Sequence, residues 1–154
     1  PEIYPYAAKE AGAYIVATGR GDFPNQVNNS LGFPGILKGA LLVRARSVTD
    51  KMAVTASYSM ANYAEKKGIN PDYIMPKMDE TDMFAYEAAD VAMEAIKNGV
   101  ARVETDWDTV YDRTLQDIGQ TRQTIDMMME KDFIKTPDNE MLEEALKKAI
   151  NAVK

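Results

Sequence analysis

Cysteine and histidine are both absent from this sequence of 154 residues. Zinc sites normally use cysteine or histidine, and a Ser-His or Cys-His catalytic pair needs a histidine. The chain therefore cannot build these centres from its own residues, and without cysteine it cannot form a disulfide framework. Carboxylates, amides, hydroxyls, amines and guanidinium groups are among the functional groups that remain.

The sequence also lacks long apolar runs. Those present are short, as at Ala40 to Val43, whereas a helix that crosses a bilayer needs about 20 apolar residues. No charged and then apolar signal opens the sequence. We therefore expect a cytoplasmic protein with no membrane partner. The net charge of −6 argues against a general affinity for nucleic acid.

A short apolar run, Ala13 to Ala17, lies between Gly12 and Gly19 and is rich in β-branched and aromatic residues. This pattern predicts a buried parallel strand. The polar loop that follows leads into a helical pattern. Loops at the carboxyl ends of strands are where open α/β sheets bind their ligands, so the pattern places a candidate site in this loop.

The loop between Thr18 and Gly35 carries four side-chain amides within five positions: Asn25, Gln26, Asn28 and Asn29. An amide both donates and accepts hydrogen bonds, so a cluster of amides can hold a carboxylate or a carboxamide in a fixed orientation. The alternative is a plain turn, because Asn and Gly are common turn formers. Asn25 is expected at the outer edge of the loop, with less influence on activity than Asn28.

Five motifs occur here in one order: Pro1-Glu2-Ile3, Gly19-Arg20-Gly21-Asp22-Phe23-Pro24-Asn25-Gln26-Val27-Asn28-Asn29, Phe33-Pro34-Gly35-Ile36, Gly39-Ala40-Leu41 and Val43-Arg44-Ala45. This ordered set resembles the malic enzymes of bacterial and archaeal type. The likeness is dense from Pro1 to Arg46 and weaker through Ala101. Gly21 and Lys38 depart from the residues that the family often has, Ser and Arg, but neither departure touches the asparagine pair.

The resemblance implies that Asn28 and Asn29 bind both substrate and cofactor, beside malate and the nicotinamide, with Asn28 the first choice. It implies an oxidoreductase that converts malate to pyruvate and CO2 with NAD or NADP and with Mg²⁺ or Mn²⁺. The family's catalytic tyrosine and lysine, its metal ligands and its Gly-rich loop lie upstream of the matching segment. We therefore expect no catalytic residue and no metal ligand in this chain, which would be part of a larger, homodimeric enzyme.

The predicted fold class is α/β. Residues 1–101 would form the carboxyl-terminal part of a Rossmann-like, doubly wound dinucleotide-binding domain, and residues 102–154 a helical extension. Apolar spacing and capping residues predict helices at 4–10 and 31–43, from the Ser47 to Asp50 cap to Gly68, from Asp79 or Thr81 to Asn98-Gly99, and from about Trp107 to Met129. Gly119 would divide the last of these, and residues 69–77 would be irregular.

A final helix is predicted after Thr136-Pro137-Asp138, with an apolar stripe formed by Met141, Leu142, Ala145, Leu146, Ala149, Ile150 and Val153. The stripe would serve either the core or a subunit contact. This leaves an alternative to the enzyme: a noncatalytic helical module for assembly, in which the amide loop is merely inherited. A basic cluster formed by Lys38, Arg44, Arg46 and Lys51 would face either cofactor phosphates or solvent.

Overall fold

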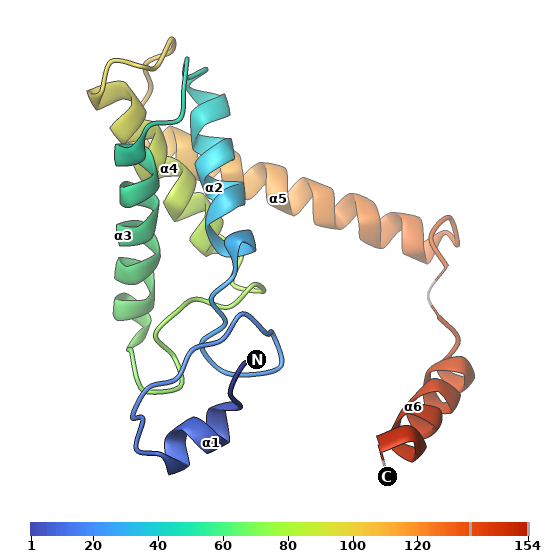
Figure 1. Cartoon of the computed structure of the whole chain (residues 1–154). Coiled ribbons are helices and arrows are strands. Elements are labelled where there is room, and N and C mark those ends of the chain that lie inside the picture. Colours follow the sequence, from blue (N-terminus) through green and yellow to red (C-terminus); the bar gives the residue numbers. More distant parts are fainter. Residues whose placement is uncertain (136, 154) are drawn as a thin grey trace. The chain divides into compact units, whose positions relative to one another are not determined.

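The structure is a computed structural model that describes residues 1–135 and 137–153. These residues divide into two compact units, Pro1–Asp117 and Ile118–Lys154. Within the described residues the chain forms six helices: α1 (Pro5–Glu10), α2 (Asn29–Leu42), α3 (Asp50–Lys67), α4 (Asp82–Lys97), α5 (Trp107–Glu130) and α6 (Asn139–Val153) (Figure 1).

Helix bounds follow local capping signals. Thr49 precedes α3, and its hydroxyl oxygen accepts a hydrogen bond from the backbone N–H of Met52 at 3.3 Å. Gly68 ends α3 at a φ of 93°, and Gly99 follows α4 at a φ of 69°. Residues without a Cβ adopt such angles most easily. The predicted ends of both helices at these glycines are therefore confirmed.

The core of the first unit lies where α4 packs against α2 and against α3. The buried face of α4 is mostly alanine, including Ala88, Ala89, Ala92 and Ala95. Small side chains on this face let the neighbouring helix approach closely, and Gly39 of α2 uses that space. A Cβ on Gly39 would overlap the carbonyl oxygen of Ala88. Backbone meets backbone at this crossing.

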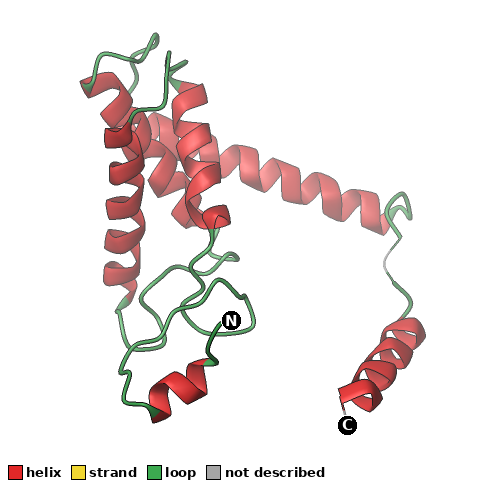
Figure 2. Ribbon diagram, in the orientation of Figure 1, coloured by secondary structure: helices red, strands yellow, loops and turns green. Residues whose placement is uncertain are grey.

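The α/β prediction is wrong for this structure, because the described residues contain helices and no strand (Figure 2). The predicted strand, Ala13 to Ala17, is an irregular segment in which Tyr14 is 77% exposed and Ile15 is 47% exposed. A strand needs a neighbouring strand to satisfy its backbone, and the described residues place none beside this segment. The described residues form only isolated bridges, a parallel one between Thr18 and Gln26 and an antiparallel one between Asn70 and Tyr73.

Helix α5 also differs from its prediction, since it runs through Gly119 without a break. The first turns of α5 complete the core of the first unit through Val110 and Thr114, which are both buried.

In the second unit, the backbone N–H of Glu140 donates to the Asp138 carboxylate at 3.0 Å at the start of α6. The predicted role of Thr136 in this cap lies outside the described residues. The side chain of Val153 lies outside them as well.

Candidate functional site

The amide loop is closed by its own backbone. The N–H of Val27 donates to the carbonyl of Thr18 at 2.8 Å, and the N–H of Thr18 donates to the carbonyl of Asn25 at 3.3 Å. These bonds join Thr18 to Asn25 and Val27, just before α2 begins at Asn29, so that residues 29–35 of the predicted loop are helical. The loop is therefore ordered without a flanking strand.

Asn25 is the structural centre of the loop. Its amide nitrogen donates to the carbonyls of Val16 at 3.0 Å and Pro71 at 2.8 Å, and its amide oxygen accepts from the N–H of Ile74 at 2.8 Å. The side chain is 5% exposed and the φ of Asn25 is 56°, a region that asparagine tolerates better than most residues. The expectation that Asn25 lies at the outer edge of the loop is wrong.

Asn28 is the N-cap of α2. Its side-chain oxygen accepts from the backbone N–H of Ser30 at 3.0 Å and from the Ser30 hydroxyl at 2.8 Å. These bonds occupy the oxygen and so fix which way the amide nitrogen faces. Among the described residues that nitrogen has no hydrogen-bond partner, and the residue is exposed. Two N–H donors are thus held ready beside the positive end of α2.

Asn29 is the first residue of α2 and is exposed, with no side-chain hydrogen bond to the described residues. The structure therefore brings Asn28 and Asn29 together at one helix end, as their adjacency in the sequence requires. The two differ in constraint, because capping orients the Asn28 amide and nothing described orients that of Asn29.

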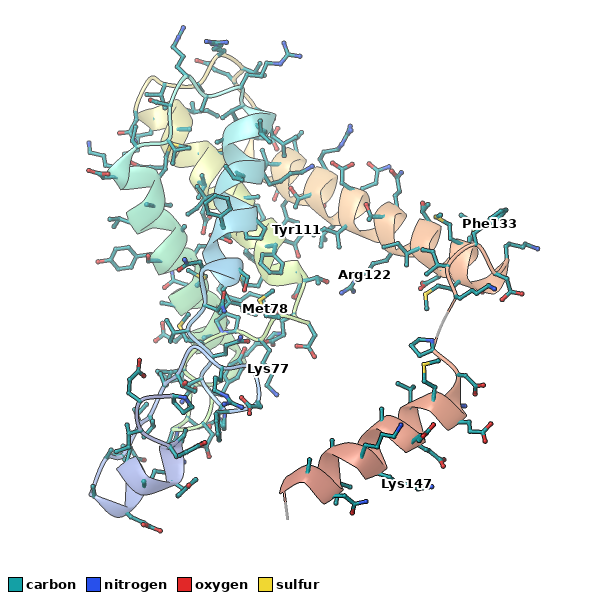
Figure 3. All side chains as sticks on the ribbon, turned by 45° about the vertical axis from the view of Figure 1, so that its right-hand side comes forward. Lys77, Met78, Tyr111, Arg122, Phe133 and Lys147 are labelled. Carbon is teal, nitrogen blue, oxygen red and sulfur yellow. The ribbon has the colours of Figure 1, made fainter. Side chains whose placement is uncertain are left out.

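A groove of about 600 Å³ opens next to this helix end. Residues 21–26 of the loop line one side, and residues of the segment 72–79 line the other. The Ser30 hydroxyl contacts the sulfur of Met78 at 3.3 Å, which joins the first turn of α2 to the edge of the groove. Lys77 and Met78, which both line the groove, are labelled in Figure 3. Asn25 and Gln26 lie in the wall, whereas Asn28 and Asn29 do not.

Glu80 holds in place the side of the groove that is formed by residues of the segment 72–79, which we call the second wall. Its carboxylate accepts from Lys67 Nζ at 2.8 Å, from the Tyr73 hydroxyl at 3.0 Å and from the N–H of Lys77 at 2.7 Å. Burial opposes the charged form, but these donors outweigh it and hold the pKa of Glu80 below its ordinary value. Burial and the neighbouring Glu80 raise the pKa of Tyr73 to about 12. The sequence did not point to Glu80, because its partners are spread between α3 and an irregular segment.

Two residues of the basic cluster, Lys38 and Arg46, are bonded to other parts of the first unit. Lys38 forms an ion pair with Asp117, which ties α2 to the first turns of α5. Arg46 donates to the carbonyl of Gly99 at 3.4 Å. These two residues therefore have partners within the first unit.

The described residues contain no group of three acidic side chains placed to hold a metal ion. The described part of the chain therefore does not fit the divalent metal that the resemblance implies. None of the described helices is long and apolar enough to cross a membrane.

Comparison with known families decides the assignment: residues 13–98 match the family described as "Malic enzyme, NAD binding domain". The chain belongs to the malic enzyme family. This confirms the resemblance read from the loop motifs. The match also covers Ala13 to Ala17, the irregular segment that was predicted to be a strand, and the amide loop.

Individual malic enzymes agree with the family match. The chain is 43% identical over 114 residues to the bifunctional malic/malolactic enzyme of Bacillus subtilis, covering 74% of this chain and 28% of that protein. The crystal structure of Entamoeba histolytica malic enzyme has 61% identity and a TM-score of 0.95, covering 100% of this chain and 32% of that one. The crystal structure of Pyrococcus horikoshii malic enzyme has 45% identity and a TM-score of 0.79, covering 85% of this chain and 30% of that one.

The chain thus spans about a third or less of the length of these relatives. Other matching malic enzymes are named NAD-dependent in one case and NADP-dependent in another.

Proposed function

We propose that this chain is part of an NAD(P)-dependent malic enzyme and that its amide loop positions malate and the nicotinamide. The observation that carries the proposal is the capped amide of Asn28, whose oxygen is fixed by Ser30 and whose nitrogen has no hydrogen-bond partner among the described residues. A carboxylate accepts such donors, and the amino end of α2 favours the negative charge.

The contribution of this segment is orientation. The proposed reaction converts malate to pyruvate and CO2, and NAD or NADP, when bound, would supply the acceptor for the hydride that leaves the C2 carbon. Asn28 donates to a malate carboxylate or to the carboxamide of the nicotinamide, and Asn29 supports it from the next position. Holding the reactants in a reactive geometry lowers the entropic part of the barrier without any proton transfer by this chain.

The first test replaces Asn28 in the full-length enzyme. Hydrogen bonds to charged groups are worth roughly 1.5–3 kcal/mol, so Asn28→Ala should lower kcat/KM for malate about ten- to a hundred-fold. Alanine also removes the helix cap, which costs about 1 kcal/mol of stability. Steady-state kinetics and the melting temperature must therefore be measured together.

Asn28→Ser separates the two effects, because serine also caps helices but carries no amide nitrogen. We expect kcat/KM to fall as for alanine while the melting temperature stays near that of the wild type. If the serine variant keeps wild-type kcat/KM, Asn28 does not bind the reactants. Asn29→Ala, at a position with no described side-chain hydrogen bond, tests the second amide without disturbing the cap.

We also propose that the enzyme acts as a homodimer. Support comes from the exposed apolar side chains of α6, which the described residues leave uncovered.

A further inference from the structure

A single carboxyl group lies buried on the apolar face of α4. Glu87 is 0% exposed, and neither of its carboxyl oxygens has a hydrogen-bond partner among the described residues. Its spacing from Phe84 and Val91 puts it on the same face of the helix as these buried residues. A lone acidic residue inside an apolar stripe was visible in the sequence, although the periodic pattern alone gives it no role.

Glycines of α2 make the space for this carboxyl. A Cβ on Gly35 would overlap the carboxyl group of Glu87 and lie 2.7 Å from its Cγ. A Cβ on Gly32 would lie 3.6 Å from Oε1 and 3.6 Å from the end of Met60. Glu87 therefore fills the gap between α2 and α4 in the half of α2 that begins at Asn28.

Among the described residues, no charged side chain offsets the burial of Glu87. The one charged residue of α2, Lys38, pairs with Asp117. Tyr63 of α3 donates to Asp82 at 2.6 Å, and Asp90 of α4 accepts from the Trp107 ring nitrogen at 2.7 Å. Burial raises the pKa of Glu87 to about 8, and the nearby backbone of Gly35 moderates the rise. The carboxyl is thus mostly protonated at neutral pH.

We propose that Glu87, in its protonated form, is a positioning residue that seats α2 on α4 and so fixes the amino end of α2, where Asn28 and Asn29 lie. Loss of the proton leaves an unpaired charge between the helices, which gains hydration only if α2 moves away. The inference rests on the proposed function for its link to catalysis, but its structural part stands without it.

The direction of the pH effect follows from proton binding. Between the ordinary carboxyl pKa of 4.5 and about 8, the folded chain keeps a proton that the unfolded chain has released. The stability of the folded chain relative to a form without this group therefore falls as the pH rises through this window. Glu87→Gln keeps the shape of the side chain and cannot ionise, so it removes this dependence.

The structural test compares the 154-residue chain with its Glu87→Gln variant from pH 5 to pH 9. We expect the melting temperature of the wild type to fall relative to that of the variant by about 4 °C or more across the range. Amide hydrogen exchange in residues 29–42 should quicken with pH in the wild type beyond the intrinsic rate, and not in the variant. Glu65→Gln, an exposed acidic residue on α3, is the matched control and should follow the wild type.

If the melting temperatures of the wild type and of Glu87→Gln change with pH by the same amount, the proposal is overturned. If the glutamine variant fails to fold, Glu87→Met provides a second side chain of similar length that cannot ionise, and the same comparison applies.

The catalytic test uses the full-length enzyme. We expect kcat/KM for malate to decline on the alkaline side in the wild type, and the midpoint of that decline to move by at least one pH unit in Glu87→Gln. An unchanged alkaline limb, in an enzyme that Asn28→Ser impairs, would overturn the link between Glu87 and the site. If Asn28→Ser has no effect, the proposed function fails, and melting and amide exchange still decide whether Glu87 seats α2.

Discussion

Asn25 shows how one side chain joins segments that are far apart in the sequence. Its amide meets Val16, Pro71 and Ile74, so it ties the amide loop to the second wall of the groove. A buried polar group with all its partners satisfied contributes through what its removal would leave behind. Asn25 therefore holds the groove in shape.

Replacing Asn25 by alanine should lower the free energy of unfolding by about 2–4 kcal/mol, because two carbonyls and one N–H lose their partner and because alanine is strained at a φ of 56°. Urea denaturation followed by circular dichroism measures this. Gln26→Ala is the control, since Gln26 makes a weaker contact to the carbonyl of Gly19 at 3.4 Å. Equal stabilities for the two variants would show that the Asn25 bonds do not hold the loop.

At this scale the sequence indicated which residue types matter but not their roles. The amide cluster was recognisable because its members are adjacent. The roles of Asn25 and Glu87 were not, because the partners of Asn25 in residues 71–74 are 46 and 49 positions away and the glycines around Glu87 lie on another helix. Burial is set by tertiary packing, which local composition does not report.

Among the elements, helices were predicted well and the strand was not. The signals that end α3 and α4 at Gly68 and Gly99 lie within one turn of the helix, so a single sequence contains them. A strand such as the one predicted at Ala13 to Ala17 needs a partner elsewhere, and apolar composition alone does not supply it. The predicted break at Gly119 was wrong for a related reason, because packing and helix length outweigh the modest cost of one glycine in a helix.

The crossing of α2 and α4 depends on Gly39. A Cβ there would overlap the carbonyl oxygen of Ala88 and lie 3.1 Å from the backbone nitrogen of Ala92. Backbone atoms of a helix cannot rotate aside as a side chain does, so the helices must separate. Gly39→Ala should lower the free energy of unfolding by about 1–3 kcal/mol in spite of the better helix propensity of alanine.

Gly119→Ala is the matched control in another helix, because a Cβ at Gly119 meets nothing within 4 Å. That variant should gain about 0.5–1 kcal/mol from helix propensity alone. Thermal and urea unfolding of both variants measure the two effects. A gain in stability for Gly39→Ala would contradict the close contact between the helix backbones.

For the whole molecule, the loop motifs indicated the family, which the match over residues 13–98 confirmed. The division at residue 101 and the binding roles of Asn28 and Asn29 stay predictions. Assembly was also left open by the sequence, because an amphipathic helix serves a core and an interface equally well. In the structure the apolar stripe of α6 is uncovered: Met141, Leu142, Leu146 and Ile150 are 49–64% exposed.

We expect the chain to self-associate through this stripe, since a second copy offers the same apolar surface and burying it is favourable. Light scattering after size exclusion should then give a mass above the 17.1 kDa of one chain. Leu146→Asp should return the mass toward that value, because it puts a charge into the contact. Asn151→Asp adds the same charge on the opposite side of α6, where the helix is polar, and should leave the association intact. A monodisperse species of 17.1 kDa at all concentrations, or equal effects of the two aspartates, would remove α6 as the contact between copies.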